Sequence, residues 1–421
     1  MTSDHQKLFE ELFNLKRFGI KTGLEHTRKL LQAVGNPHYQ LKFIHVAGTN
    51  GKGSTCAFLY NILKQAGKKV GLYTSPHLLN INERIRVNGK TISNEEIITF
   101  MRKNQKHIKN IQSTFFETTT VMAFDHFSKH NVDIAIIETG LGGRLDSTNV
   151  ITPEVSIITS ISMDHMDVLG KGVDQITKEK SGIIKDSVPL ILLGQDEYIQ
   201  SIILEKAKMK NSIVTIIHPD NATLIRIDCK GTLFSYNGNI FHISLIGKHQ
   251  VLNCMIAIEA AKKVCDEVNQ DKINKACRST KWPGRIEHLI NYIYYDVAHN
   301  ASSISAIIET IKTIHPGKSI IGLFCLKGNK DIDSISDVIR GHFFQLLVTS
   351  DEKGLLLPMN RLCSLLSNHQ VEPTPVPSVE NGITILKKAG KEDCVGLIFG
   401  SHYIANEIYR MFEISFDTGN I

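Results

Sequence analysis

The segment Gly48-Thr49-Asn50-Gly51-Lys52-Gly53-Ser54 constrains the fold of this chain more than any other feature. It follows an apolar, strand-like run at Phe43–Ala47 and opens a run with helical spacing. A glycine-rich turn between a buried strand and a helix directs backbone N–H groups and the positive helix end at one point, which is a geometry that binds phosphate. Lys52 adds a charge for terminal phosphates, and Ser54 or Thr55 offers a hydroxyl to a magnesium ion.

The turn departs from the strict Walker pattern. Val46 occupies the first glycine position, and Gly53 separates Lys52 from Ser54. This departure narrows the choice of nucleotide-binding family. An ordinary glycine-rich loop with a nearby lysine stays open as an alternative, but the β-branched strand and the abrupt change to helical spacing favour phosphate binding.

Composition limits the class of protein. A chain of 421 residues predicts two domains, and no apolar run is long enough to span a bilayer. The N-terminus lacks the apolar core of a secretion signal, and eight cysteines scattered singly favour reduced thiols, so we expect a cytoplasmic protein. The net charge of +6 suits anionic small molecules. Because there is no arginine-rich tract, we expect no nucleic-acid partner. Because there is no long apolar run, we expect no membrane partner.

Strand-like and helix-like stretches alternate after the glycine-rich turn, which predicts an α/β fold with a mostly parallel sheet. Val132–Ile137, Val155–Thr159 and Pro189–Leu193 are typical of central strands buried on both faces. Between Asn211 and Ile246 the strands become short, with a hairpin turn at Tyr236–Asn239. We therefore expect a small antiparallel sheet attached to the first domain.

Turn residues at Trp282–Arg285 mark the domain junction. We predict an ATP-binding domain at residues 1–288 and a smaller, Rossmann-like α/β domain at residues 289–421. The Pro373–Pro377 run is predicted to be only an extended loop. Strands of the second domain are expected at Asn291–Asp296, Ser319–Cys325, Gln345–Thr349 and Cys394–Phe399.

Candidate metal ligands follow the strands of the first domain. Glu138 ends a predicted strand, where ligands bind in open α/β sheets and where an acid can hold nucleotide magnesium. His165 lies beside acids after the next strand, Ser75 follows another, and Lys180 lies in a helical run that Gly182 ends. Taken singly, each of these residues also suits a structural role. Glu138 could cap a loop and His165 could be a structural histidine. Ser75 could be a capping serine and Lys180 a surface lysine.

Several motifs in fixed order resemble the folylpolyglutamate synthase family, often bifunctional with dihydrofolate synthase in bacteria, within the larger group of Mur-type amide-forming ligases. The motifs are Gly48–Ser54, Thr74–Leu78, Glu138–Asn149, Asp164–Asp167, Trp282–Arg285, Asp296–Asn300 and Gly400–Tyr403. Each is ordinary alone, and their joint order is specific.

The resemblance implies roles residue by residue. Gly48–Ser54 would cradle the ATP phosphates with catalytic Lys52, and His299 would lie near the reacting phosphate. The resemblance implies further ATP contacts from Asn253, Arg285 and Asp296. It implies metal ligation by Ser75, Glu138, His165 and Lys180, the last as a carbamate that offers the oxygen donors magnesium prefers. It implies folate contacts from Thr114, Phe115, Phe116, Glu117, Leu145 and Asp146.

The implied reaction joins L-glutamate to tetrahydrofolate, and in the bifunctional case also to dihydropteroate, through an acyl phosphate. ATP would be the co-substrate, with two Mg²⁺ ions and K⁺ as a further candidate cofactor, in a monomer. A cell-wall Mur ligase is one alternative, although only 47 residues precede Gly48, too few for the nucleotide-sugar-binding domain of those enzymes. A P-loop ATP switch is another, and it would not need the His165/Lys180 or Asp296/His299 pairs.

Overall fold

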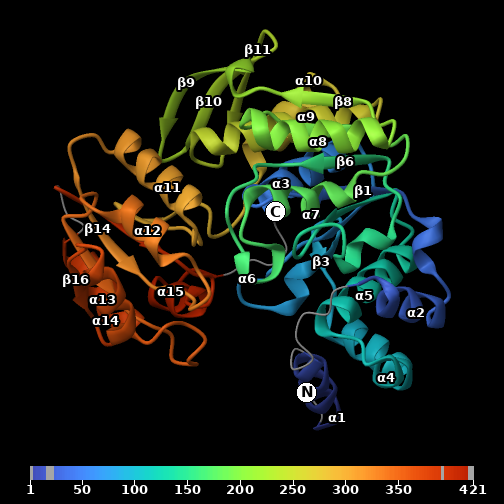
Figure 1. Cartoon of the computed structure of the whole chain (residues 1–421), viewed down its shortest axis with the longest axis horizontal. Helices are drawn as coiled ribbons and strands as arrows, with labels where there is room; N and C mark the ends of the chain where they lie inside the picture. Colours follow the sequence, from blue (N-terminus) through green and yellow to red (C-terminus); the bar gives the residue numbers. More distant parts are fainter. Residues whose placement is uncertain (1–2, 16–22, 390–392, 416–421) are drawn as a thin grey trace.

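Three β-sheets organise the chain in a computed structural model that describes residues 3–15, 23–389 and 393–415 (Figure 1). The first two sheets lie in the longer, N-terminal part of the chain. Its helices and strands are α1 (Ser3–Asn14), α2 (Glu25–Ala33), β1 (Phe43–Ala47), α3 (Lys52–Gln65), β2 (Val70–Tyr73), β3 (Ile85–Val87), β4 (Lys90–Thr91), α4 (Asn94–Ile111), α5 (Phe115–Lys129), β5 (Ile134–Glu138), β6 (Val155–Ile158), α6 (Met166–Leu169), α7 (Val173–Lys180), β7 (Leu190–Leu193), α8 (Glu197–Met209), β8 (Val214–Ile217), β9 (Ala222–Asp228), β10 (Gly231–Tyr236), β11 (Asn239–Ile243), α9 (Lys248–Val264) and α10 (Gln270–Ser279).

The large sheet has eight strands in the order β4-β3-β2-β5-β1-β6-β7-β8. The strands from β2 to β8 in this order are parallel, and β3 and β4 add an antiparallel edge. The central strands β1, β5 and β6 are buried along their whole length, as expected for continuous apolar runs covered by helices on both faces. Because β1, β2, β5 and β6 run in the same direction, their carboxyl ends meet at one edge of the sheet.

Helices cover both faces of this sheet (Figure 1). On one face, α3, α9 and α10 pack with buried side chains such as Phe58, Leu63 and Ile256. On the other, α4 and α5 pack with Phe100, Phe124 and others around the β2 and β5 strands. The helix that follows the glycine-rich turn, α3, packs against both the sheet and the helices α9 and α10, which fixes the direction of its N-terminus.

The small sheet is antiparallel, in the order β11-β10-β9, as predicted for this part of the chain. The hairpin turn lies where expected, with Asn237 (φ 47°) and Gly238 (φ 74°) both left-handed. The predicted extent, from Asn211 to Ile246, is too long at its start. Val214–Ile217 instead pairs in parallel with β7 and extends the large sheet.

The third sheet has six strands, in the order β12-β13-β17-β14-β15-β16, and forms a second α/β unit beside the first (Figure 1). The predicted fold class is therefore confirmed. The division after residue 288 stays a prediction, and β12 runs across it. The elements are β12 (Glu287–Ile290), β13 (Ile293–Tyr295), α11 (Ala301–Ile314), β14 (Ser319–Phe324), α12 (Ile332–Ile339), β15 (Gln345–Val348), α13 (Met359–Asn368), β16 (Pro373–Pro375), α14 (Val379–Ala389), β17 (Cys394–Phe399) and α15 (Ala405–Met411).

The sequence analysis predicted only an extended loop for the proline-rich run, and this prediction was wrong. Residues Pro373–Pro375 form β16, which pairs in parallel with β15. Proline lacks the N–H of a sheet ladder and is tolerated at an edge, where one side needs no partner. The run therefore closes one edge of the third sheet.

Within the described residues, no helix is both long enough and apolar enough to cross a bilayer. All eight cysteines are free thiols, in keeping with the prediction from their spacing.

Candidate active site

The glycine-rich turn joins β1 to α3 at the floor of a cleft between the two α/β units. Gly51 caps α3 with φ 88°, and a Cβ there would lie 2.2 Å from Oδ1 of Asn253. Only glycine fits both the backbone and the neighbour. The first N–H groups of α3 therefore open into a cavity of about 330 Å³ lined by the turn and by Asn253.

Lys52 lies folded over this turn. Its Nζ donates hydrogen bonds to the backbone oxygens of Gly48 and Thr49, both at 3.1 Å. Next to it, the hydroxyl oxygens of Ser54 and Thr55 are buried without a hydrogen-bond partner among the described residues. Burying an unpaired hydroxyl costs about 1–3 kcal/mol, so these groups are suited to a ligand.

The four predicted metal ligands all line the same cavity, although they come from separate segments. Glu138 is buried at the end of β5, and its Oε2 accepts a hydrogen bond from the Ser75 N–H at 3.1 Å. Burial outweighs the attraction of Lys52 and raises the pKa of this carboxyl. His165 follows β6, and burial is the main cause that lowers its pKa to about 4. The structure thus brings together Ser75, Glu138, His165 and Lys180.

Lys180 is not a surface residue. It is 5 % exposed at the end of α7, and its Nζ donates to the Gly48 oxygen at 2.8 Å. Burial, assisted by the positive charge of Lys52, lowers the pKa of Lys180 to about 7. A large fraction of this amine is neutral near pH 7, which is unusual for a lysine.

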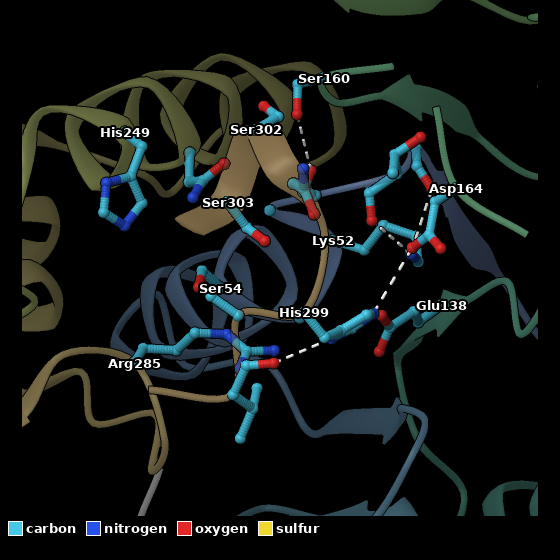
Figure 2. Close-up of a pocket in the computed structure, with 18 of the residues that line it drawn as sticks. Lys52, Ser54, Glu138, Ser160, Asp164, His249, Arg285, His299, Ser302 and Ser303 are labelled. Carbon is cyan, nitrogen blue, oxygen red and sulfur yellow. Dashed lines mark hydrogen bonds and ion pairs between the residues drawn. The ribbon is translucent and has the colours of Figure 1, made fainter. Parts of the chain in front are cut away.

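Asp164 ties the two units together at the cleft (Figure 2). Its Oδ1 accepts from Nζ of Lys330 at 2.6 Å, with both side chains 8 % exposed, and its Oδ2 lies 3.5 Å from Nε2 of His299. Burial alone would raise the pKa of Asp164, but the His299 hydrogen bond and the surrounding positive groups hold it far below its usual range. Asp164 is therefore ionised and acts as the anchor of a charged network.

A reciprocal amide pair adds a second connection. Nδ2 of Asn50 donates to Oδ1 of Asn300 at 3.3 Å, and Nδ2 of Asn300 donates to Oδ1 of Asn50 at 3.0 Å. Asn300 also caps α11, because its side chain accepts from the Ser303 N–H. The phosphate-binding turn and the first turn of α11 are thus directly linked.

Asp296 and Arg285 lie in the cleft on the second unit. Both carboxylate oxygens of Asp296 are engaged, accepting from the backbone N–H groups of Ile286 (2.8 Å) and Ala298 (2.7 Å). Asp296 therefore holds in place two backbone segments of the second unit, one next to Arg285 and the other next to His299. Figure 2 shows Arg285 and His299 pointing to the same region as Ser54.

The predicted folate residues adjoin the cavity but do not line it. Thr114 and Glu117 form the capping box of α5, and Asp146 accepts from the N–H groups of Gly140 and Leu141. Phe116 packs so closely against Gly140 that a Cβ there would lie 2.3 Å from its ring. The remaining two are buried Phe115, whose ring lies under the Arg84 guanidinium, and half-buried Leu145.

The sequence analysis predicted no site role for three side chains that lie in or beside the cleft. Lys330 follows β14, and its position after a strand end was an available signal. His249, at the start of α9, lines the cavity, and burial lowers its pKa to about 4. Trp282, the single tryptophan of the chain, lies against the turn: a Cβ on Gly53 would be 2.8 Å from its indole nitrogen. No local pattern predicted that contact.

Two family models match the chain, one for each of the two units that border the cleft. Residues 46–261 match the Mur ligase middle domain, and residues 284–402 match the Mur ligase glutamate ligase domain. A phosphate-binding sheet facing a second α/β unit of this kind defines an ATP-dependent Mur-type ligase.

Relatives and solved structures narrow the class further. The dihydrofolate synthase/folylpolyglutamate synthase of Bacillus subtilis is 37 % identical over 94 % of this chain and 96 % of its own length. A structure of Escherichia coli FolC with DHPP and ADP is 26 % identical with a TM-score of 0.84, covering 96 % of this chain and 97 % of the other. Mycobacterium tuberculosis folylpolyglutamate synthase shares the fold, with a TM-score of 0.89, 24 % identity, and coverage of 98 % and 100 %.

This chain belongs to the dihydrofolate synthase/folylpolyglutamate synthase family. The predicted family and ligase class are confirmed, and the comparisons support neither the cell-wall ligase nor the ATP switch.

Proposed function

We propose that this chain uses ATP to join L-glutamate to reduced folates such as tetrahydrofolate, and also to dihydropteroate. One observation carries the proposal: the phosphate-binding turn, the Ser75–Glu138–His165–Lys180 set and the Arg285–His299 side of the second unit face a single cleft. The B. subtilis relative, which this chain matches over nearly its whole length, is named for both activities.

ATP would lie with its phosphates in the turn from Gly48 to Ser54. The N–H groups at the start of α3 and the Lys52 ammonium supply positive charge there. Lys52 would exchange its present hydrogen bonds to Gly48 and Thr49 for phosphate oxygens. Asn253 and Arg285 line the walls beside the turn and suit contacts to the rest of the nucleotide.

The side chains around the turn suit magnesium, on the condition that Lys180 is carbamylated. The buried Glu138 carboxylate and the Ser54 hydroxyl, which has no hydrogen-bond partner in the part of the chain that the structure describes, are the kind of oxygen donor that Mg²⁺ prefers. Ser75 and His165 line the same cavity. Lys180 as an amine is no magnesium ligand. Bound magnesium would neutralise phosphate charge, and Lys180 would join its ligands only as a carbamate.

Lys180 is suited to carbamylation. A neutral amine is required, and burial lowers the pKa of Lys180 to about 7. Its nitrogen attacks carbon dioxide, an N–C bond forms, one proton leaves to solvent, and the product is a carbamate anion. A buried cation beside Lys52 is thereby replaced by an anion with two oxygen donors.

The chemistry then needs little more than positioning and charge. A carboxylate oxygen of the folate attacks the terminal phosphorus of ATP, ADP leaves, and an acyl phosphate forms. The neutral amine of glutamate attacks the acyl carbon, inorganic phosphate leaves, and the nitrogen loses a proton. Lys52, Arg285 and His299 lie where they can stabilise the charge on the transferred group.

Water must be excluded from the acyl phosphate. The Asp164–Lys330 ion pair and the Asn50–Asn300 amide pair hold the second unit against the phosphate-binding turn. These contacts suit a closed state in which the second unit covers the reacting groups. We propose that ATP and folate binding favour this state over an open one.

Folate would lie on the Phe116 side of the cleft. Its flat heterocycle suits an aromatic wall formed by Phe115 and Phe116. Glu117 and Asp146, which are engaged with backbone N–H groups, would hold the α5 cap and the loop after β5 in place beside it. Thr114 and Leu145 would complete this wall.

Finer properties of the chain are proposed with the same function. We propose two Mg²⁺ ions, K⁺ as an additional cation, domains at 1–288 and 289–421, and a cytoplasmic monomer that binds neither nucleic acid nor membranes. Light scattering tests the oligomeric state, and activity with and without KCl tests the role of potassium.

The deciding experiment measures phosphate release with dihydropteroate and tetrahydrofolate side by side, each with and without glutamate. We expect glutamate-dependent release with both. Release with tetrahydrofolate alone restricts the chain to folylpolyglutamate synthesis, and release that ignores glutamate contradicts ligase activity.

A further inference from the structure

A group of three side chains with metal-ligand chemistry lies away from the cleft, where α4 packs beside α5. Glu96 comes from the first turn of α4, His126 from the last turn of α5, and His130 is the residue that directly follows α5. One ligand atom of each lies within 4.8 Å of the other two, and no other such group of three occurs within residues 3–15, 23–389 and 393–415.

The separations match a metal site better than hydrogen bonds. Oε1 of Glu96 lies 3.4 Å from Nδ1 of His126 and 3.6 Å from Nε2 of His130. A hydrogen bond between such atoms would measure about 2.7–3.2 Å. Ligands about 2.0–2.1 Å from a tetrahedral zinc ion are separated by about 3.4 Å, so an ion fits between these atoms with little movement.

The two histidines are prearranged for this role. His130 lies four residues after His126, at the cap of α5, and the ring centroids of the two histidines are 4.1 Å apart. Nδ1 of His130 donates to the backbone oxygen of His126 at 2.9 Å, which leaves the lone pair on the Nε2 that faces Glu96. Histidines that bind metals are commonly oriented by such a hydrogen bond from their other nitrogen.

Glu96 has a separate structural role that leaves half of its carboxylate available. Its Oε2 accepts from the Ser93 N–H at 2.8 Å and closes the capping box of α4, while Oε1 faces the imidazoles. Capping accounts for one oxygen only.

We propose that Glu96, His126 and His130 bind one divalent transition-metal ion, with Zn²⁺ as the best match, and that this ion joins α4 to α5. Two imidazoles and one carboxylate suit Zn²⁺ and its neighbours in the first transition row, whereas Mg²⁺ prefers oxygen alone. The side chains of Glu96 and His130 are 41 % and 40 % exposed, so a water molecule can take the fourth position. The site differs in chemistry and place from the cation set of the cleft.

Calorimetric titration with Zn²⁺ tests the proposal on full-length, untagged chain that has been stripped with chelator. Millimolar Mg²⁺ and ADP are kept present so that the cleft binds its own ligands. We expect one Zn²⁺ per chain, with affinity at least tenfold weaker in His130→Ala and in Glu96→Gln, because glutamine can keep the helix cap. His107→Ala removes an exposed histidine from α4 outside the group and should bind as the wild type does.

Thermal unfolding provides the second measurement. Zn²⁺ should raise the unfolding midpoint of the wild type and of His107→Ala, and should leave His130→Ala and Glu96→Gln unchanged. Midpoints measured in chelator establish that the variants are folded. Wild-type Zn²⁺ affinity in His130→Ala, or a wild type that binds no Zn²⁺ under these conditions, overturns the proposal.

Discussion

Replacing Lys180 by methionine tests the central electrostatic feature of the cleft. Methionine keeps the apolar stem and removes the amine. The Gly48 oxygen loses one donor, but it still accepts from Lys52 at 3.1 Å and is not left unpaired. The main consequence of the change is therefore the removal of a buried ionisable group.

The magnitude follows from the pKa of Lys180, about 7 in the folded chain against an ordinary value of 10.5. Below pH 7 both the folded and unfolded states bind the proton, and the buried charge costs the fold about 5 kcal/mol. Between pH 7 and 10.5 the unfolded state binds more protons, so stability rises with pH and this cost shrinks to about 2 kcal/mol at pH 9. Lys180→Met should therefore stabilise the fold more at pH 6 than at pH 9, by about 2.5 kcal/mol.

Thermal unfolding in buffers free of carbon dioxide measures this difference. The gain in midpoint from Lys180→Met should be about 3–4 °C larger at pH 6 than at pH 9. Lys178→Met, which changes a lysine that is 67 % exposed on the same helix, is the matched control and should show no such dependence. A gain for Lys180→Met that is equal at both pH values would refute the lowered pKa and, with it, the reason for expecting a carbamate.

Three further substitutions test the cleft. Lys52→Ala should lower kcat for phosphate release at least about 10²–10³-fold, because it removes a charge from the transferred phosphoryl group; near-normal turnover would contradict its role. Lys330→Met leaves Asp164 buried without its ion-pair partner, at a cost of about 3–5 kcal/mol to the closed state. X-ray scattering with ADP should then show a larger radius of gyration than in the wild type, and an unchanged radius would exclude the ion pair as a latch. Phe116→Ala should raise KM for folate about tenfold and leave KM for ATP unchanged in steady-state kinetics; an unaltered folate KM would place the substrate elsewhere.

Local patterns predicted most of the fold, because apolar runs and turn residues act over a few neighbours. Val155–Thr159 and Pro189–Leu193 became β6 and β7 with only end residues differing. The errors arose where tertiary pairing decided the outcome. Val214–Ile217 joined β7 instead of the small sheet, and Pro373–Pro375 became a strand only because the edge of β15 was free to pair.

The candidate site was predictable to the extent that its residues follow strand ends. Ser75, Glu138 and His165 each come after a strand of one parallel sheet, so the sequence could place them at one edge. Contacts between the two units had no such signal. The approach of Lys330 to Asp164 joins positions 166 residues apart, and their proximity depends on how the units dock. The internal hydrogen bonds of Asp146 and Asp296 were likewise invisible in the sequence.

The placement of Trp282 gives this chain a built-in optical probe. Its indole is the only one in the chain, and it rests against Gly53 at the point where the phosphate-binding helix begins. Fluorescence excited selectively in that ring therefore originates beside the turn at which ATP is proposed to bind, in the segment that connects α10 to β12. Stopped-flow records of unlabelled wild-type chain can therefore test the proposed nucleotide binding and the proposed closure of the two units in real time.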